Sequence, residues 1–173
     1  MRIRKTLKPG NEKSARFRAM RLLERRPHAA GELARKLAQR GYEPEIVKRT
    51  IEYLKGIGLL DDARFAGNFV RYRLSGAPRG PRRLAAELTS RGVDRKLAAD
   101  AAAAGMGEGG EAELALAAAR RYLKRRPLKF VGQRTVEAAK ERQRAIAWLL
   151  RQGFGGSAAF KALKTAGLPE EED

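Results

Sequence analysis

The stretch LKGIGLLDDARFAGNFVRYRL, residues 54–74, decides the fold, because one helix ends in it and the next begins. Gly56 and Gly58 are placed to stop the first helix. Asp61 is predicted to be the N-cap of the second, since an aspartate carboxylate accepts hydrogen bonds from the free N–H groups of the first turn. Asp62 follows where a negative charge favours the helix dipole. We interpret this acidic pair as capping rather than acid–base chemistry, because no partner for catalysis is near it in sequence.

Apolar residues on both sides of this cap predict how the two helices are joined. Leu60 and Phe65 have the spacing of a hydrophobic staple, in which a residue before the cap packs on the first turns of the helix. Phe65, Phe69 and Val70 then fall on one face at helical spacing. The stretch is therefore expected to join two helices at a fixed angle and to bury the joint.

Composition points to an all-α protein with a polyanionic partner. The chain has 173 residues, with 38 Lys and Arg against 20 Asp and Glu, a net charge of +18. Such an excess is typical of proteins that bind nucleic acid or nucleoprotein. Helix-forming residues dominate, and no run of β-branched residues predicts a strand. There is no Cys, and no apolar run approaches the roughly 18 residues of a membrane span, so a cytoplasmic location without membrane contact is expected.

Cap and stop signals predict nine helices. Asn11 is expected to cap the first, Asp94 the sixth and Ser157 the ninth, and Pro44 and Pro81 suit the first turns of the third and fifth. Leu150 and Phe160 are predicted to point inward. The expected helices cover residues 11–26, 29–40, 43–55, 61–75, 81–91, 94–105, 111–126, 135–152 and 157–166.

A repeat runs through these helices. Gly41, Gly92 and Gly153 each follow a leucine by four residues and precede a bulky apolar residue. This pattern predicts a helix, a left-handed glycine turn and a second helix, three times over, although Leu-x-x-x-Gly also recurs by chance in such sequences. The fold class is then all-α, with three tandem three-helix repeats in an elongated, curved array of either hand. The expected parts are a flexible basic arm (1–10), three units (11–56, 57–105 and 106–167, the last with a Gly-rich linker at its start) and an acidic tail (168–173).

Known catalytic and metal motifs are missing from the chain. A phosphate-binding P-loop needs Gly-Lys, and the sequence contains no such pair. One His and no Cys do not make a usual zinc site, so His28 is interpreted as a surface or capping residue. No nucleophile–base set is evident. We therefore expect no enzyme activity, no cofactor and no metal.

Four segments, in this order, resemble the RecX family of recombinase regulators. They are LLERRPHAAGELARKLAQRGY (22–42), IEYLKGIGLLDDARFAGNFVRYRL (51–74), GPRRLAAELTSRGV (80–93) and AIAWLLRQGF (145–154). The second is the specific one, and the others are individually weak. Ala29 departs from the family, which usually has Ser there to form a capping box with Glu32.

The resemblance implies a helical body that lies on a RecA filament and touches recombinase and DNA. The DNA, single- or double-stranded, would be held mainly through its backbone. RecX proteins restrain filament assembly, ATP turnover and strand exchange, so the chain is expected to do the same as a monomer. The alternative is a sequence-specific DNA-binding protein, because helix pairs joined by a tight Gly turn are similar to helix-turn-helix units. A specific reader should prefer one duplex sequence, whereas a filament regulator should need the recombinase.

Basic residues recur in all three units and supply the candidate contacts, while the few aromatic residues are mostly interpreted as core or joint residues. Arg82 and Arg83 are placed outside the apolar stripe of their helix, where reversal of charge should spare folding. The candidate contacts with RecA or DNA are Arg35, Lys36, Arg40, Lys48, Arg82, Arg83, Arg91, Arg95, Lys96, Arg144 and Arg151. The expected structural signature is Gly41, Gly58, Leu60, Asp61, Asp62, Phe65, Phe69, Gly92 and Gly153.

Overall fold

The computed structural model describes residues 10–126 and 136–167, and all the regular secondary structure in these ranges is α-helical. The predicted acidic tail and all but the last residue of the predicted basic arm lie outside them. No helix in the described ranges is long and apolar enough to cross a bilayer. The helices are α1 (Glu12–Arg25), α2 (Ala30–Ala38), α3 (Pro44–Gly56), α4 (Asp62–Gly76), α5 (Pro81–Ser90), α6 (Arg95–Ala104), α7 (Gly110–Arg125), α8 (Val136–Arg151) and α9 (Gly156–Thr165).

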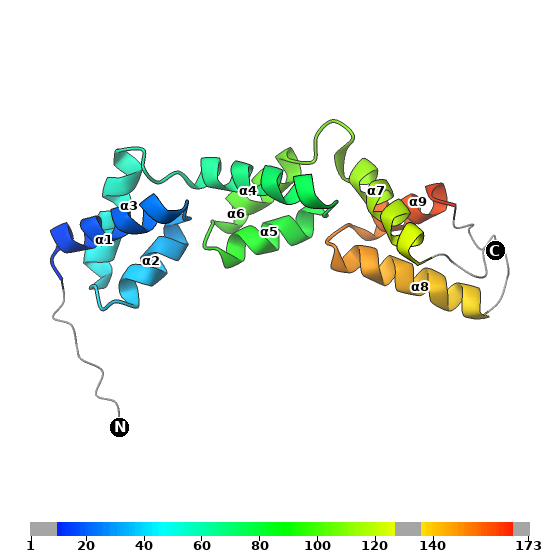
Figure 1. Cartoon of the computed structure of the whole chain (residues 1–173), viewed down its shortest axis with the longest axis horizontal. Helices are drawn as coiled ribbons and strands as arrows, with labels where there is room; N and C mark the ends of the chain where they lie inside the picture. Colours follow the sequence, from blue (N-terminus) through cyan, green and yellow to red (C-terminus); the bar gives the residue numbers. More distant parts are fainter. Residues whose placement is uncertain (1–9, 127–135, 168–173) are drawn as a thin grey trace, which may run out of the picture.

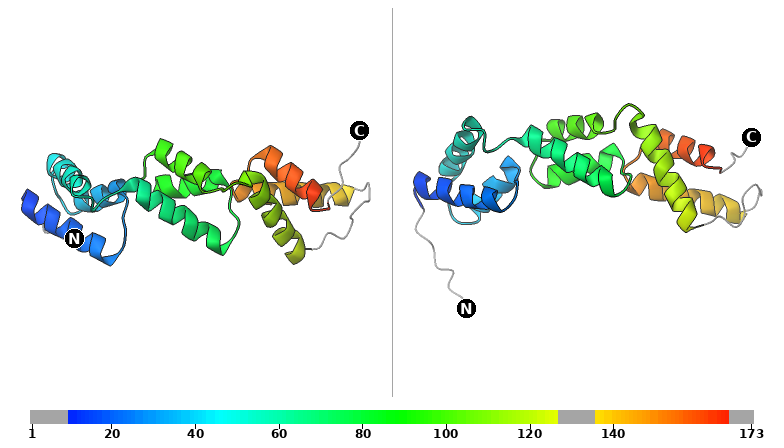
Figure 2. Two further views of the ribbon diagram at one scale, coloured as in Figure 1. Left: turned by 90° about the horizontal axis from the view of Figure 1, so that it is seen from above. Right: turned by 45° about the horizontal axis from the view of Figure 1, so that its top comes forward.

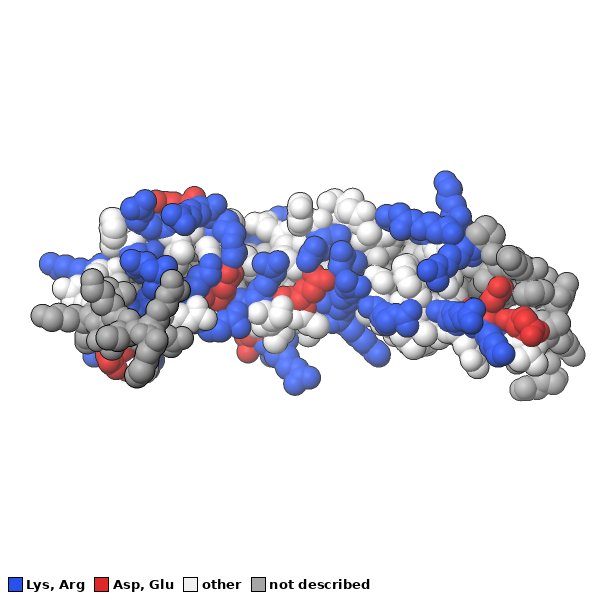
Figure 3. Space-filling model, turned by 60° about the horizontal axis from the view of Figure 1, so that its bottom comes forward, with Lys and Arg blue, Asp and Glu red and all other residues white. Residues whose placement is uncertain are grey.

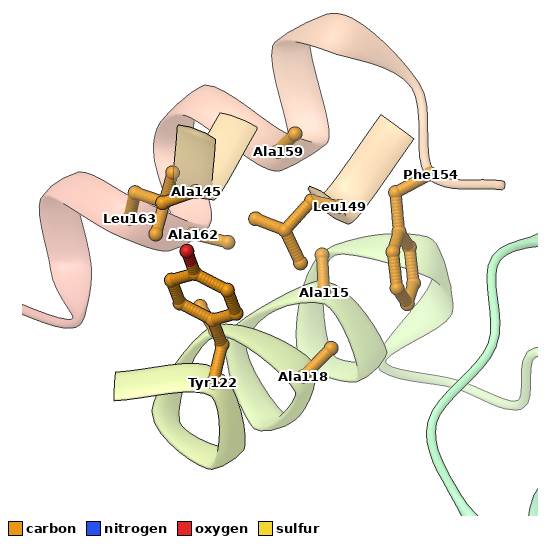
Figure 4. Close-up of a cluster of buried hydrophobic side chains, with 10 residues drawn as sticks. Ala115, Ala118, Tyr122, Ala145, Leu149, Phe154, Ala159, Ala162 and Leu163 are labelled. Carbon is orange, nitrogen blue, oxygen red and sulfur yellow. The ribbon is translucent and has the colours of Figure 1, made fainter. Parts of the chain in front are cut away.

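The helices form three bundles in an elongated row, which Figures 1 and 2 show from three directions. Each bundle has its own apolar cluster, built around Leu33 and Leu37 in α1–α3, around Leu84 and Leu88 in α4–α6, and around Leu149 in α7–α9. In the third cluster, side chains from α7, α8 and α9 point toward one another (Figure 4). Within the described residues, whenever two helices are in extensive contact, both belong to the same bundle. The prediction of tandem three-helix repeats is confirmed.

The three repeated glycines adopt the left-handed turn that the pattern predicts. Gly41, Gly92 and Gly153 have φ angles of 84°, 90° and 91°. In each turn the N–H of the following residue donates to the carbonyl of the leucine four residues before the glycine, at 3.4, 3.2 and 3.3 Å. This closes the end of the middle helix of each unit, because a left-handed residue lets the chain fold back on free carbonyl groups.

The first two units meet at the N-terminus of α2. Its N-cap, Ala29, has no side chain that can accept a hydrogen bond from the first turn. The second unit supplies the missing acceptors: the Asp62 carboxylate accepts the N–H of Ala30 at 2.8 Å, and the Gly92 carbonyl accepts the N–H of Gly31 at 3.2 Å. Free N–H groups at the start of a helix need such partners when water is excluded. The N-terminus of α2 is therefore completed by its neighbour.

The second and third units meet in the same way at the N-terminus of α5. The N–H of Gly80, the N-cap, donates to the Gln152 carbonyl at 2.9 Å. The N–H of Arg82, the second residue of α5, donates to the carbonyl of Gly153 at 3.2 Å. In both joints, then, the N–H of the second residue of a middle helix donates to the carbonyl of the left-handed glycine of the next unit.

An arginine reinforces each joint. The Arg35 guanidinium donates to the Ser90 carbonyl at 3.0 Å, and that of Arg83 donates to the Arg151 carbonyl at 3.4 Å. Both acceptors lie two residues before the joint glycine, where a helix C-terminus leaves its carbonyl groups free. Two of the predicted contact residues therefore bind other parts of their own chain.

The joints leave no room for side chains at their glycines. A Cβ atom on Gly31 would lie 2.5 Å from the Gly92 carbonyl oxygen, and one on Gly92 would lie 2.6 Å from the Glu32 nitrogen. A Cβ atom on Gly80 would likewise meet the backbone of Gly153, and one on Gly153 would meet the backbone of Arg83. Gly41 has the same turn geometry, but nothing described lies within 4 Å of such an atom.

The deciding stretch folds largely as predicted, with two differences. Asp61 is the N-cap of α4 and accepts the N–H of Arg64 at 2.9 Å. Asp62 lies in the first turn of α4, as predicted, and its carboxylate also accepts the N–H of Ala30 at the start of α2. The predicted staple is divided, since Leu60 packs in the first cluster and Phe65 against the second. Leu59 is 49% exposed, so the joint is buried only in part.

Three predictions for the third unit are wrong. α9 begins at Gly156 with Gly155 as N-cap, not Ser157, and the N–H of Gly155 donates to the Glu111 carboxylate at 2.5 Å. Leu150 and Phe160 are each 44% exposed rather than inward. The buried stripe of α8 runs through Ala138, Ala145 and Leu149, and the next residue along a helix points about 100° away from its neighbour.

Gly92→Ala should destabilise the protein more than Gly41→Ala does. Both substitutions force a Cβ atom into a left-handed conformation, which costs about 1–2 kcal/mol. Only Gly92→Ala also places that atom against the backbone of the preceding unit, and overpacking of this kind adds about 1–3 kcal/mol. Urea unfolding followed by circular dichroism measures both.

Gly41→Ala is the matched control, because its φ angle is close to that of Gly92 and its surroundings are open. Equal losses of stability in the two variants would show that the close approach of the units contributes nothing.

Candidate basic interface

Basic side chains cover the row of bundles from end to end. Figure 3 shows Lys and Arg over all three units on one face of the molecule, with few Asp or Glu between them. Positive charge of the described residues is thus spread along the array rather than confined to one end. A surface of this kind raises the local concentration of polyanions and steers them toward it.

One cluster of acidic and basic side chains lies mainly within the second unit. Glu87 lies 2.7 Å from Arg73, 2.9 Å from Arg79 and 3.2 Å from Arg83. Arg83 also donates to the side-chain oxygen of Gln152 at 2.9 Å. Reversing the charge of Arg83 would place an acid against Glu87 and remove the side-chain hydrogen bonds of Arg83 to the third unit. The expectation that Arg82 and Arg83 can be reversed together without affecting the fold is therefore wrong.

A second cluster surrounds the start of α2. The Glu32 carboxylate lies 2.5 Å from Arg26 and 3.3 Å from Lys36. Burial alone would raise the pKa of Glu32, but hydrogen bonds from Arg26 and Lys36, with the charges of His28 and Arg26, lower it below its ordinary 4.5. Lys36, a predicted contact residue, therefore forms an ion pair within its own unit.

The predicted contact residues thus fall into two groups. Arg35, Lys36 and Arg83 bind within the chain, and the Arg91 guanidinium stands 5.0 Å from the centre of the Phe69 ring. The rest are exposed and form no ion pair with any Asp or Glu of the described residues: Arg40, Lys48, Arg82, Arg95, Lys96, Arg144 and Arg151.

Residues of α7 that were not among the candidates complete a cationic cleft with α8. Its walls carry Arg121 and Arg125 from α7, Arg126 from the C-cap of that helix, and Arg144, Trp148 and Arg151 from α8. The basic run at 120–126 is visible in the sequence, but the residues between the two helices do not predict that α7 and α8 form a cleft together. Trp148, grouped with the core and joint residues, is only partly buried and lines this cleft.

Of the two roles expected for His28, surface residue or capping residue, the first is wrong, because the residue is only 4% exposed. One ring nitrogen, Nδ1, lies 2.8 Å from the Arg26 carbonyl, and the other, Nε2, lies 3.0 Å from the Lys36 ammonium. An ammonium can only donate, so Nε2 must accept and Nδ1 must carry the proton. Burial, as the largest cause, lowers the pKa of His28 below 6.5, because it disfavours the charged ring. No group of three or more possible metal ligands occurs among the described residues.

The amino-acid sequence is similar to proteins named Regulatory protein RecX. Residues 15–54 match the family model described as RecX, first three-helix domain, and residues 61–101 match RecX, second three-helix domain. The protein from Mycobacterium ulcerans is 36% identical over 168 residues, covering 97% of this chain and 92% of its own. That from Mycobacterium tuberculosis is 37% identical over 152 residues, covering 88% and 85%.

Two solved structures have the same fold. The crystal structure of RecX from Lactobacillus salivarius superimposes with a TM-score of 0.71 at 18% identity, covering 90% of this chain and 96% of the other. A second crystal structure, of regulatory protein RecX, gives a TM-score of 0.71 at 22% identity, covering 89% and 73%.

Lowering the pH through 6.5 should destabilise the protein through His28. The folded pKa of His28 is lowered, so below about 6.5 the unfolded chain binds more protons and stability falls as pH falls. Glu32 acts in the same direction but only below about 4.5. Urea midpoints measured between about pH 7.5 and pH 5.5 should decrease for the wild type and change less for His28→Gln.

Equal slopes in the two proteins would show that His28 is not the group responsible. A variant of an exposed residue on the same unit, Arg40→Gln, serves as control and should keep the wild-type slope.

Proposed function

The chain belongs to the RecX family, and from this premise we propose that it binds the RecA filament on DNA and lowers its ATP hydrolysis and strand exchange. The relatives carry the name regulatory protein, which supports action through binding rather than through catalysis by the chain itself. The filament would then be held by a surface, and its own catalytic cycle would be slowed.

Exposed cations on every unit are the observation that carries this proposal. Arg40 and Lys48 lie in the first unit, Arg95 and Lys96 in the second, and Arg144 in the third. Because the joints hold the units in a row, these charges are spaced along one elongated body (Figures 1 and 3). A repeating polyanion such as a DNA backbone, or a filament that carries DNA, can meet several of them at once.

The proposed contact can be tested at the start of α6 with little risk to the fold. Arg95 and Lys96 are exposed in the first turn of α6, where acidic residues favour the helix dipole. The variant Arg95→Glu/Lys96→Glu should therefore fold, yet inhibit DNA-dependent ATP hydrolysis by RecA about tenfold less well than the wild type, since both attractive charges become repulsive. The concentration for half-maximal inhibition is the measurement.

Arg120→Glu/Lys124→Glu reverses the same number of charges on α7 and should lose less, because neither residue is among the proposed contacts. Unchanged ATP hydrolysis and strand exchange at saturating wild-type protein would reject the regulatory proposal. Preference for one duplex sequence, with no effect on the recombinase, would support the sequence-specific DNA-binding protein instead.

A further inference from the structure

The cleft between α7 and α8 combines positive charge with an aromatic wall. We call it the α7–α8 cleft; it has a volume of about 450 Å³ and is lined by Arg121, Tyr122, Arg125, Arg126, Arg144, Ala147, Trp148 and Arg151. Arginines thus make up most of its lining, and no acidic residue contributes to it. Both helices belong to the third unit, so one bundle forms the whole cleft.

The arginines are spaced along both walls of the cleft, where they can bind an anion that carries several charged groups. Arg121 and Arg125 are one helical turn apart on α7, and Arg144 and Arg151 are two turns apart on the facing side of α8. All four are exposed, and none forms an ion pair with an acid of the described residues. Like charges gathered in this way repel one another, and an anion with several charged groups relieves the repulsion.

An aromatic wall adds to the positive charge of this cleft, and it contains Trp148. The Trp148 ring lies 5.0 Å from the ring of Tyr122, measured between centres, with the planes tilted by 38°. Tyr122 is buried in the cluster of the third unit, so the Trp148 indole packs against a ring that is held in the core. Trp148 is only partly buried, and its remaining surface lines the cleft. A flat apolar group beside an anion would find a stacking partner there.

We propose that the α7–α8 cleft binds single-stranded nucleic acid, with a base stacked on Trp148 and the neighbouring phosphates on the arginines. Single strands offer both features, since their bases are free to stack and their phosphates repeat along the backbone. In a duplex the bases are already stacked inside the helix, and an acidic peptide supplies carboxylates without a matching series of rings. The inference rests on the proposed function only in that this function brings the chain to DNA.

Trp148 is the only tryptophan of the chain, so its fluorescence reports on this cleft alone. Titration of the whole protein with oligo-deoxythymidine should quench the fluorescence to saturation, and added salt should weaken the binding. Arg121→Gln/Arg125→Gln removes two charges from one wall, and Arg144→Gln/Arg151→Gln removes two from the other. Each pair should weaken binding about tenfold and reduce the slope of log affinity against log salt by about 1.4.

Arg120→Gln/Lys124→Gln is the matched control, because it removes two charges at the same spacing from α7 but outside the cleft. It should weaken binding less than either cleft pair. The two cleft pairs check each other, since Arg121 also donates to the Gly76 carbonyl at 3.4 Å and only the α7 pair loses that bond. Circular dichroism confirms that each variant is folded.

Three results would overturn the proposal. The first is no quenching by oligo-deoxythymidine, and the second is an equal loss of affinity in the control pair. The third is competition by duplex DNA, inorganic polyphosphate or poly-glutamate as effective as that of the single strand, which would show a site for charge alone. The recombinase is not present, so any of these results leaves the proposed function standing. A wild-type protein that shows this quenching but, in a separate assay, does not inhibit the recombinase would reject the proposed function instead.

Discussion

A hydrogen bond between peptide groups of neighbouring units is the interaction on which the array depends. The N–H of Gly31 donates to Gly92, and the N–H of Arg82 donates to Gly153. In both joints a helix without a capping side chain is completed by the left-handed turn of the next unit. The positive end of one helix thereby meets the negative end of another, so the helix dipoles also favour the arrangement. Each unit thus supplies what its neighbour lacks, as in other repeat proteins.

These joints also sort the basic residues by role. Arg35 and Arg83 bind carbonyl groups across the joints, and Glu87 holds three arginines within the second unit. All of them stabilise the array, and the arginines around Glu87 have their charge partly balanced, whereas Arg35 donates to a neutral carbonyl and keeps its charge. The exposed cations that form no ion pair with a described Asp or Glu, among them Arg95 and Lys96, are then the most available to a polyanion. A count of positive charges does not distinguish cations that are bound within the chain from those that are not, whereas the contacts in the structure do.

The three units share a plan but differ in what their surfaces offer. The turn at Gly41 is the counterpart of the joint glycines, yet nothing described lies close to it. The third unit alone brings arginines and Trp148 together in one cleft, since α7 and α8 both carry basic residues on their facing sides. Repetition explains the fold, and departures from repetition locate the candidate sites.

Local chemistry in the sequence determined the helices, the cap at Asp61 and the left-handed turns at the repeated glycines, because each of these depends on neighbours within a few residues. Only the tertiary structure decided which N–H groups those turns would complete, that Asp62 would cap α2, and that His28 would be buried. The same holds for the α7–α8 cleft, whose walls lie on two helices with residues 127–135 between them. Long-range pairing of this kind leaves no periodic signal in the sequence, since it depends on how whole units approach one another.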